Sequence, residues 1–290
     1  MKKIINVVCV CFLLVLSFFC SACSKNNQDE NVKQELSDEQ KSFNLILEKV
    51  RELEILSSAY NLENSTMRTL VYIRSVRYNS GQWQMIGGQS DAEFDDYVLQ
   101  NQTKSVSELK NLSSFVLPKT KEESDFVHMF ATLNVLYAQE NSAMHDLAGW
   151  GGDLCQLAVD AKNSGKLGQE LNDYVKSIFN SKTGAFNDQD LCADLDAVNL
   201  AVLLKQSGSI TTSLREYSNS LNVQERKKGF IQNVFNTEYS SQEQLKQDMF
   251  SRVKSNLFLN LWGQQNGLSF NDDLSVIEVC CDVFATYLMS

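Results

Sequence analysis

Apolar side chains recur every three or four residues along most of this chain, which is the spacing that places them on one face of an α-helix. The first such stripe comprises Phe43, Ile46, Leu47, Val50, Leu53 and Leu56. Comparable stripes run through residues 126–137, 191–203, 245–262 and 274–288. Because Pro118 is the only proline, few of these segments contain a forced break. The pattern predicts an all-α fold, with a single globular domain of about eight to ten helices over residues 37–290.

Helix starts are marked by capping boxes, in which a serine precedes a Glu or Gln by three residues. Ser37, Ser90 and Ser241 each occupy such a position. Strict alternation of apolar and polar residues, which is typical of a half-buried strand, is brief. Residues 67–78 are predicted to form another helix, and a short hairpin over residues 71–83 is the alternative.

The N-terminal segment has a different pattern. A basic start precedes an uncharged apolar stretch, residues 7–19, and the small residues Ser21 and Ala22 lie directly before Cys23. This order is similar to the leader of bacterial prolipoproteins. The resemblance implies that residues 1–22 form a lipoprotein signal peptide and that Cys23 is the lipidated residue of the mature chain.

Cys20 departs from that leader, because its position usually carries Leu or another aliphatic residue. The alternatives are a transmembrane anchor or an ordinary secretion signal. Two acyl chains on Cys23 would give stable membrane residence, since each buried methylene contributes about 0.8 kcal/mol. The polar residues 23–36 are predicted to form a flexible tether. We therefore expect a lipid-anchored domain on the outer face of the cell membrane of a bacterium. We expect that bacterium to be Gram-positive.

Acidic residues exceed basic ones, with 36 Asp and Glu against 26 Lys and Arg and a formal net charge of −10. This balance argues against nucleic acid and anionic lipid headgroups as partners. The expected partners are the membrane, through the lipid anchor, and an unidentified ligand or component of the cell envelope.

Four of the eight cysteines lie in the predicted domain, at positions 155, 192, 280 and 281. All four fall within apolar helical stripes, and none has the CxxC spacing of a zinc or redox site. Buried thiols are one interpretation. A disulfide between Cys155 and Cys192, which an extracytoplasmic location permits, is the other.

Residues 145–154 depart from simple helix packing. Glycine occupies three of the four positions from 149 to 152, which would cost a helix roughly 3 kcal/mol relative to alanines. Asp146 and Asp153 fall along one edge of the predicted helix, and Trp150 lies on the adjoining apolar face. The glycines either allow another backbone to come close or leave an open floor beneath a ligand.

A second acidic segment covers residues 188–200. Asp190 and Asp194 share one face of the predicted helix, whereas Asp196 and Asn199 lie three positions apart in another sector. If that sector is buried, both side chains need hydrogen-bonding partners.

Together the two segments suggest that the acids converge across a cleft with Trp150 at its floor. Carboxylate oxygens are ligands for Ca²⁺ or Mg²⁺, and a protonated acid beside an ionised one can act in acid–base chemistry. The alternative is that these acids lie at a helix N-terminus and along a solvated edge. The candidate ligands for a divalent cation are Asp146, Asp153, Asp190, Asp194 and Asp196.

The chain has two histidines, and His145 directly precedes Asp146. His128, the His145-Asp146 pair and then Asp194 or Asp196 follow one another along the chain in the order H…HD…D. This order is similar to that of HD-domain phosphohydrolases, which are all-helical enzymes. The resemblance implies that these His and Asp side chains hold a metal that activates water. The interval after the first histidine is short for that family, and a glycine-rich segment follows the His-Asp pair.

Three hypotheses follow. The leading one is a lipid-anchored helical domain that binds a ligand or envelope component near Trp150 and the facing acidic helix. The second is a metal- or carboxylate-dependent hydrolase, and the third is a structural surface protein. The candidate ligand-binding or catalytic residues are His128, Asp146, Trp150, Asp153, Asp194, Asp196 and Asn199.

Overall fold

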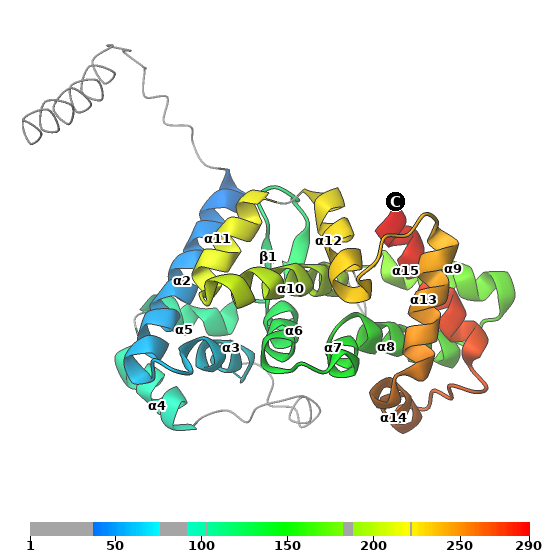
Figure 1. Ribbon diagram of the computed structural model, residues 1–290, viewed down its shortest axis with the longest axis horizontal. Helices are drawn as coiled ribbons and strands as arrows, with labels where there is room; N and C mark the ends of the chain where they lie inside the picture. The colour runs from blue at the N-terminus through cyan, green and yellow to red at the C-terminus, as the bar shows by residue number, and fades with distance from the viewer. Residues whose placement is uncertain (1–36, 76–91, 103, 182–187, 221) are drawn as a thin grey trace, which may run out of the picture. The chain divides into compact units, whose positions relative to one another are not determined.

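Helix α10 (Asp188–Ser207) runs through the middle of the fold and packs along α6 (Phe126–Ala138) (Figure 1). The structure is a computed structural model that describes residues 37–75, 92–102, 104–181, 188–220 and 222–290. Every residue of α6 from Phe126 to Leu136 is buried, as is every residue of α10 from Leu191 to Ala201. A helix that is buried on all sides lies in the core. The polar side chains of α6 and α10 therefore have to find partners inside the protein.

Two groups of helices flank this central pair (Figure 1). In the first group, α2 packs against α3, α4, α5 and α11, and in the second, α15 packs against α8, α9, α12 and α13. The helices other than α6 and α10 are α2 (Asp38–Tyr60), α3 (Ser65–Ser75), α4 (Ala92–Asn101), α5 (Lys104–Glu108), α7 (Ser142–Ala148), α8 (Trp150–Asn163), α9 (Gly168–Phe179), α11 (Ile210–Ser220), α12 (Val223–Phe235), α13 (Gln242–Ser255), α14 (Leu257–Gln265) and α15 (Leu274–Met289). A 3₁₀ turn, η2 (Leu109–Asn111), follows α5.

Two of the predicted helix starts are confirmed. The Ser37 side chain accepts a hydrogen bond from Gln40 N at 3.2 Å, and the Ser241 side chain accepts one from Gln244 N at 3.4 Å. Each bond satisfies an N–H group that the first turn of a helix would leave without a partner. Ser90 lies outside the described residues.

The helices are more numerous than predicted, because the described residues contain fourteen α-helices where we expected eight to ten. The stripe over residues 245–262 shows one reason. It is divided at Asn256, whose side chain accepts hydrogen bonds from Phe258 N and Leu259 N and so begins a new helix, α14. An asparagine N-cap ends one helix and starts the next without any proline.

A short two-stranded sheet makes the protein largely helical rather than purely helical. Antiparallel strands β1 (Ser114–Val116) and β2 (Glu123–Asp125) flank a turn that contains Pro118. The alternative hairpin over residues 71–83 is wrong for residues 71–75, which belong to α3, and its remainder lies outside the described residues.

Among the described residues, the cysteines at 155, 192, 280 and 281 are buried thiols with no disulfide between them, so the Cys155–Cys192 alternative is wrong.

None of the helices within the described ranges is both long and apolar enough to cross a membrane. The leader, Cys23 and the tether lie outside those ranges and stay predictions.

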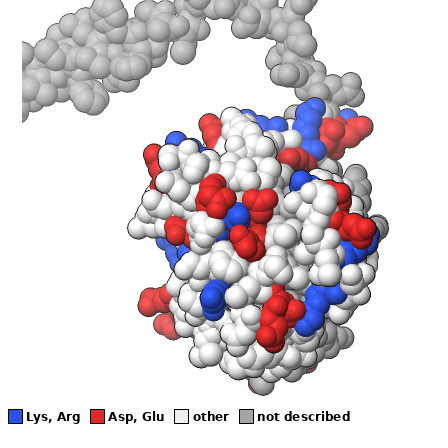
Figure 2. All heavy atoms as spheres, turned by 90° about the vertical axis from the view of Figure 1, so that its right-hand side faces the viewer, with Lys and Arg blue, Asp and Glu red and all other residues white. Residues whose placement is uncertain are grey.

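Charges of both signs are interspersed on the face that carries the C-terminal helices (Figure 2). Lys246 Nζ lies 3.4 Å from Glu243 and 3.2 Å from Glu278, and Lys162 Nζ lies 2.7 Å from Asp273. Both of these lysines are therefore paired with acids.

Candidate metal centre

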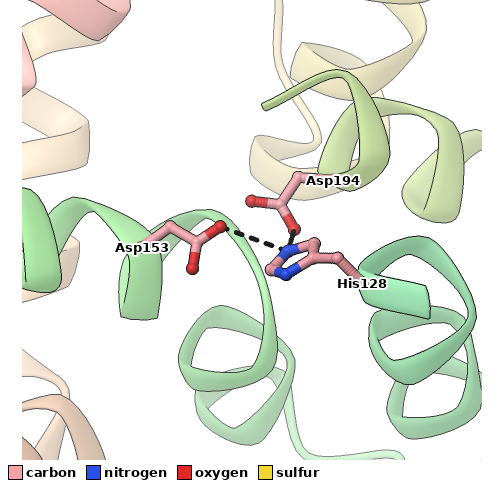
Figure 3. A group of neighbouring side chains, drawn as sticks. All are labelled: His128, Asp153 and Asp194. Atoms are coloured by element: carbon pink, nitrogen blue, oxygen red, sulfur yellow. Dashed lines mark hydrogen bonds and ion pairs between the residues drawn. The ribbon is translucent and has the colours of Figure 1, made fainter. Parts of the chain in front are cut away.

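Three side chains from three helices meet at the imidazole of His128 (Figure 3). His128 on α6 places its Nε2 3.0 Å from Asp194 Oδ1 on α10 and 3.1 Å from Asp153 Oδ2 on α8. One ligand atom from each residue lies within 4.8 Å of those from the other two. We call these three residues the His-Asp-Asp cluster.

Local capping fixes the position of the histidine. Asp125 is the N-cap of α6, and its side chain accepts a hydrogen bond from His128 N at 2.7 Å. His128 therefore lies in the first turn of α6, and Asp153 lies in the first turn of α8. Because helix starts have well-defined geometry, both side chains are held on rigid elements.

Gly149 provides the space for Asp194. A Cβ atom at this position would lie 3.0 Å from Asp194 Oδ1 and 3.1 Å from Thr132 Cγ2. Thr132 Oγ1 donates to Ala148 O at 2.9 Å and lies 3.5 Å from Asp194 Oδ1. The absence of a side chain at Gly149 thus lets the carboxylate of α10 approach the start of α8.

Burial differs among the three members, with side-chain exposures of 8% for His128, 20% for Asp153 and 1% for Asp194. Asp153 is therefore the member through which solvent reaches the cluster. Within the described part of the chain, neither Asp153 nor Asp194 pairs with a lysine or arginine. In the part of the chain that the structure describes, the cluster thus pairs two carboxylates with a single imidazole.

The electrostatics follow from this composition. Burial and the nearby Asp153 charge raise the pKa of Asp194 to about 8, although His128 opposes the shift. Burial disfavours the imidazolium, but the two carboxylates outweigh it and raise the pKa of His128 well above its usual range. Without a metal, the cluster therefore retains protons at neutral pH.

The second oxygen of Asp194 has no hydrogen-bond partner among the described residues, although it is buried. Leaving a buried polar atom without a partner costs about 1–3 kcal/mol, and more when the group is charged. Asp153 Oδ2 is likewise buried and has no hydrogen-bond partner among the described residues, although it lies 3.1 Å from His128 Nε2.

Asp196 and Asn199 lie on other faces of α10 and take part in a separate buried cluster. Tyr217 OH donates to Asp196 Oδ1 at 2.5 Å, and Arg226 Nη1 donates to the same oxygen at 3.3 Å. Arg226 also pairs with Glu122. Asn199 Nδ2 donates to Leu195 O and Arg226 O. These contacts join α10 to α11 and α12, and through Arg226 to the turn before β2, so neither residue faces the His-Asp-Asp cluster.

Asp146 is held apart from the cluster as well. Trp150 Nε1 donates to its Oδ1 at 3.0 Å, and Arg252 Nε donates to its Oδ2 at 2.7 Å. Both carboxylate oxygens therefore have partners. Asp190 is half-buried one turn before Asp194, and its charge contributes to the raised pKa of Asp194.

The arrangement implied by the HD-domain resemblance is not formed. His145 Nε2 lies 2.7 Å from Gln139 O, and Asp146 pairs with Arg252. The His145-Asp146 pair thus contributes no atom to the cluster around His128. Its place is taken by Asp153, which lies seven residues after Asp146 on the next helix.

The glycines after Asp146 allow the backbones of α7 and α8 to come close together. A Cβ on Gly151 would lie 2.8 Å from Asp146 O, and a Cβ on Gly152 would overlap Leu147 O. Both contacts join α7 to α8, which confirms the first of the two explanations for the glycine-rich segment. Thr132, Arg226 and Arg252 were not predicted to contact these acids, because nothing in their local sequence marks the distant acids that they meet.

The fold and the cluster define a largely helical protein with a buried centre of one histidine and two aspartates. The chain belongs to the family described as YkzU uncharacterised protein, which matches residues 130–290. The matched segment contains Asp153 and Asp194 and begins two residues after His128. No curated protein and no solved structure matches the chain. The function is therefore inferred from the geometry.

Proposed function

We propose that this protein is a lipid-anchored, extracytoplasmic domain that binds a divalent transition metal through His128, Asp153 and Asp194. The observation that carries the proposal is the approach of two carboxylates to a single imidazole nitrogen, at 3.0 and 3.1 Å. Two ligands of a tetrahedral metal at about 2.0–2.2 Å from the ion lie roughly 3.3 Å apart. A small inward or outward shift of these side chains is enough to admit an ion.

Hydrogen bonding alone serves this arrangement poorly. Nε2 of His128 carries at most one hydrogen, so it donates well to only one of the two carboxylates. A metal ion would satisfy all three groups and would also provide positive charge beside the orphaned oxygen of Asp194. The proposal therefore explains both the convergence of the acids and the absence of a lysine or arginine from the described part of this site.

The donor set favours one class of metal. Imidazole nitrogen suits Zn²⁺, Fe²⁺ and related ions, whereas Ca²⁺ and Mg²⁺ prefer oxygen ligands alone. One imidazole and two carboxylates suit Zn²⁺ or Mn²⁺ better than the Ca²⁺ or Mg²⁺ considered from the acidic pattern.

A metal-dependent hydrolase is a second candidate function. The number of protein ligands favours it. Three protein ligands leave at least one coordination position for water, as in catalytic zinc sites. Asp153, with its 20% exposed side chain, is the side from which water and a substrate would enter. Hydrolysis of a generic phosphodiester such as bis-p-nitrophenyl phosphate in the presence of Zn²⁺ or Mn²⁺ would separate this function from metal binding alone.

Metal binding can be tested with the mature protein after treatment with a chelator. We expect one equivalent of Zn²⁺ or Co²⁺ to bind, by equilibrium dialysis and by Co²⁺ absorption in the visible range. Asp153→Asn, Asp194→Asn and His128→Gln should each weaken binding by at least tenfold. Asp160→Asn is the matched control, because Asp160 lies on the same helix as Asp153 and its carboxylate accepts a hydrogen bond from Gln156, away from the cluster. Equal binding by all variants, or no stoichiometric binding, would refute the proposal and leave the cluster a structural ion pair.

The location has a separate test. Cys23→Ala should remove the site of lipid attachment and move the protein from the membrane fraction to the soluble extracytoplasmic fraction. Mass spectrometry of the wild-type N-terminus should show an acylated cysteine. An intact leader on protein recovered from the cytosol would contradict this part of the proposal.

A further inference from the structure

A small pocket of about 220 Å³ opens beside α10, where its lining begins at Val198, about one helical turn after Asp194. It is bordered by α7, α8, α12 and α13, and Trp150 contributes to its lining. None of the three cluster residues lines it. A ligand in this pocket would therefore contact none of the proposed metal ligands.

The wall that α10 contributes is apolar. Val198, Ala201 and Val202 follow one another along the same face of the helix, and Val234 of α12 also contributes to the lining. Val202 is 38% exposed, which is unusual for a large aliphatic residue of this helix, whose residues from Leu191 to Ala201 are buried. A ligand with an apolar body would remove this surface from water, at a gain of about 25 cal/mol per Å².

Cationic groups accompany that apolar wall. Lys205, one turn beyond Ala201 on α10, lines the pocket and has no ion-pair partner within the described ranges. Arg252 lines it as well and is held in place by Asp146 Oδ2 at 2.7 Å and by Val234 O at 2.5 Å. The only acid in the lining is Asp146, whose two oxygens already accept hydrogen bonds from Trp150 and Arg252.

This distribution of charge is unusual for the molecule. The whole chain has a net charge of −10, yet the lining of this pocket contains the Arg252–Asp146 ion pair and the further cation Lys205, which is an excess of one positive charge. A guanidinium fixed in orientation and an unpaired ammonium are well suited to a carboxylate. Charge complementarity and the apolar wall therefore select the same kind of ligand.

We propose that this pocket binds a small carboxylic acid with a short aliphatic body, with the carboxylate at Lys205 and Arg252 and the aliphatic part against Val198 and Val202. The volume limits the size of the ligand. At roughly 30 Å³ per water molecule in the liquid, the pocket holds the equivalent of about seven waters. An acid of roughly six carbons fits that space, whereas a long fatty acid or a peptide does not.

Hexanoate is a suitable probe, and hexan-1-ol is its neutral counterpart. We expect hexanoate to bind the mature wild-type protein saturably, as followed by tryptophan fluorescence and by calorimetry, and hexan-1-ol to bind at least tenfold more weakly. Lys205→Glu should weaken hexanoate binding by at least tenfold. Lys254→Glu, an equivalent exposed charge reversal on α13 outside the pocket, should leave it unchanged.

A second variant tests the location rather than the charge. Val202→Trp places a large side chain at the partly exposed edge of the pocket and should abolish hexanoate binding while leaving metal binding intact. The proposal is overturned if hexanoate shows no saturable binding, if hexan-1-ol binds equally well, or if Lys205→Glu and Lys254→Glu have the same effect. Retention of full binding in Val202→Trp would overturn it as well.

Discussion

Asp194 and Asp196 lie two residues apart on α10, and both side chains are fully buried, yet their surroundings differ in composition. Asp196 meets the guanidinium of Arg226 and the hydroxyl of Tyr217. Among the described residues, Asp194 meets the imidazole of His128, the hydroxyl of Thr132 at 3.5 Å and, beyond the imidazole, a second carboxylate. Burial raises the pKa of both acids, to about 8 for Asp194 and about 7 for Asp196.

The difference separates a structural cluster from a candidate binding site. The Arg226 guanidinium supplies donors for Asp196 and Glu122 and thereby joins α12 to α10 and to the turn before β2. The His-Asp-Asp cluster has an excess of acceptors and a shortage of donors. Buried acids without a fixed positive charge destabilise a fold unless an ion or proton compensates them. A cluster that relies on retained protons in place of a fixed positive charge is where a ligand is expected.

The largest effect should come from the structural cluster. Arg226→Met would leave the buried carboxyl group of Asp196 without its guanidinium, and breaking a buried pair in this way costs about 3–5 kcal/mol of unfolding free energy. Urea unfolding followed by circular dichroism measures the loss. Lys228→Met is the control, because Lys228 is exposed on the same helix and should change the stability by less than about 0.5 kcal/mol. Equal stabilities for the two variants would show that Arg226 does not hold this part of the fold.

An intermediate effect is expected at Gly149. Gly149→Ala would place a Cβ at 3.0 Å from Asp194 Oδ1 and 3.1 Å from Thr132 Cγ2. Such overpacking should reduce the unfolding free energy by about 1–3 kcal/mol and should also weaken metal binding, because it displaces a ligand. Adding Thr132→Ser to this variant removes the crowded methyl group and should restore part of the loss. Unchanged metal affinity in Gly149→Ala would contradict the role of Asp194 as a ligand.

The smallest effect on stability should come from Asp194→Asn in metal-free protein. The folded protein keeps a proton on Asp194 up to a pKa of about 8, whereas the unfolded chain releases it near pH 4. The wild-type unfolding free energy should therefore fall as the pH rises between these values, and asparagine removes this contribution. We expect the variant to lie within about 1 kcal/mol of wild type at pH 6 and to be the more stable of the two at pH 8.

Chemical denaturation at both pH values, with a chelator present, checks this prediction. Asp160→Asn should follow the wild-type pH dependence, because its carboxylate accepts a hydrogen bond from Gln156 and is not part of the cluster. A loss at pH 6 as large as that of Arg226→Met would mean that Asp194 has a structural role equal to that of Asp196.

Much of the helical architecture was predictable because its signals are local. The stripe from Phe43 to Leu53 is buried as its spacing predicts, and Ser37 and Ser241 cap the helices that follow them. The number of helices was harder to predict from the sequence. Asn256 divides a continuous apolar stripe into two helices through side-chain hydrogen bonds, which the spacing of the apolar residues does not reveal. The strands beside Pro118 were missed for a similar reason, because three-residue strands are too short to show an alternating pattern.

The candidate site was predictable only as a set of residue types. The pattern selected Asp153, Asp194 and His128, but it selected Asp146 and Asp196 equally, and the packing of the helices divided these acids among different partners. Arg226 and Arg252 decided that division, and they lie 30 and 106 residues away from the acids they meet.

The sequence by itself determined that the chain is helical, where several helices begin, and which acids lie in apolar segments, because these properties depend on neighbours within a few residues. Tertiary structure alone decided which acid meets an arginine and which meets His128. Residues two positions apart on a helix point about 200° apart. The helix that each of them faces is therefore set by the packing of distant segments.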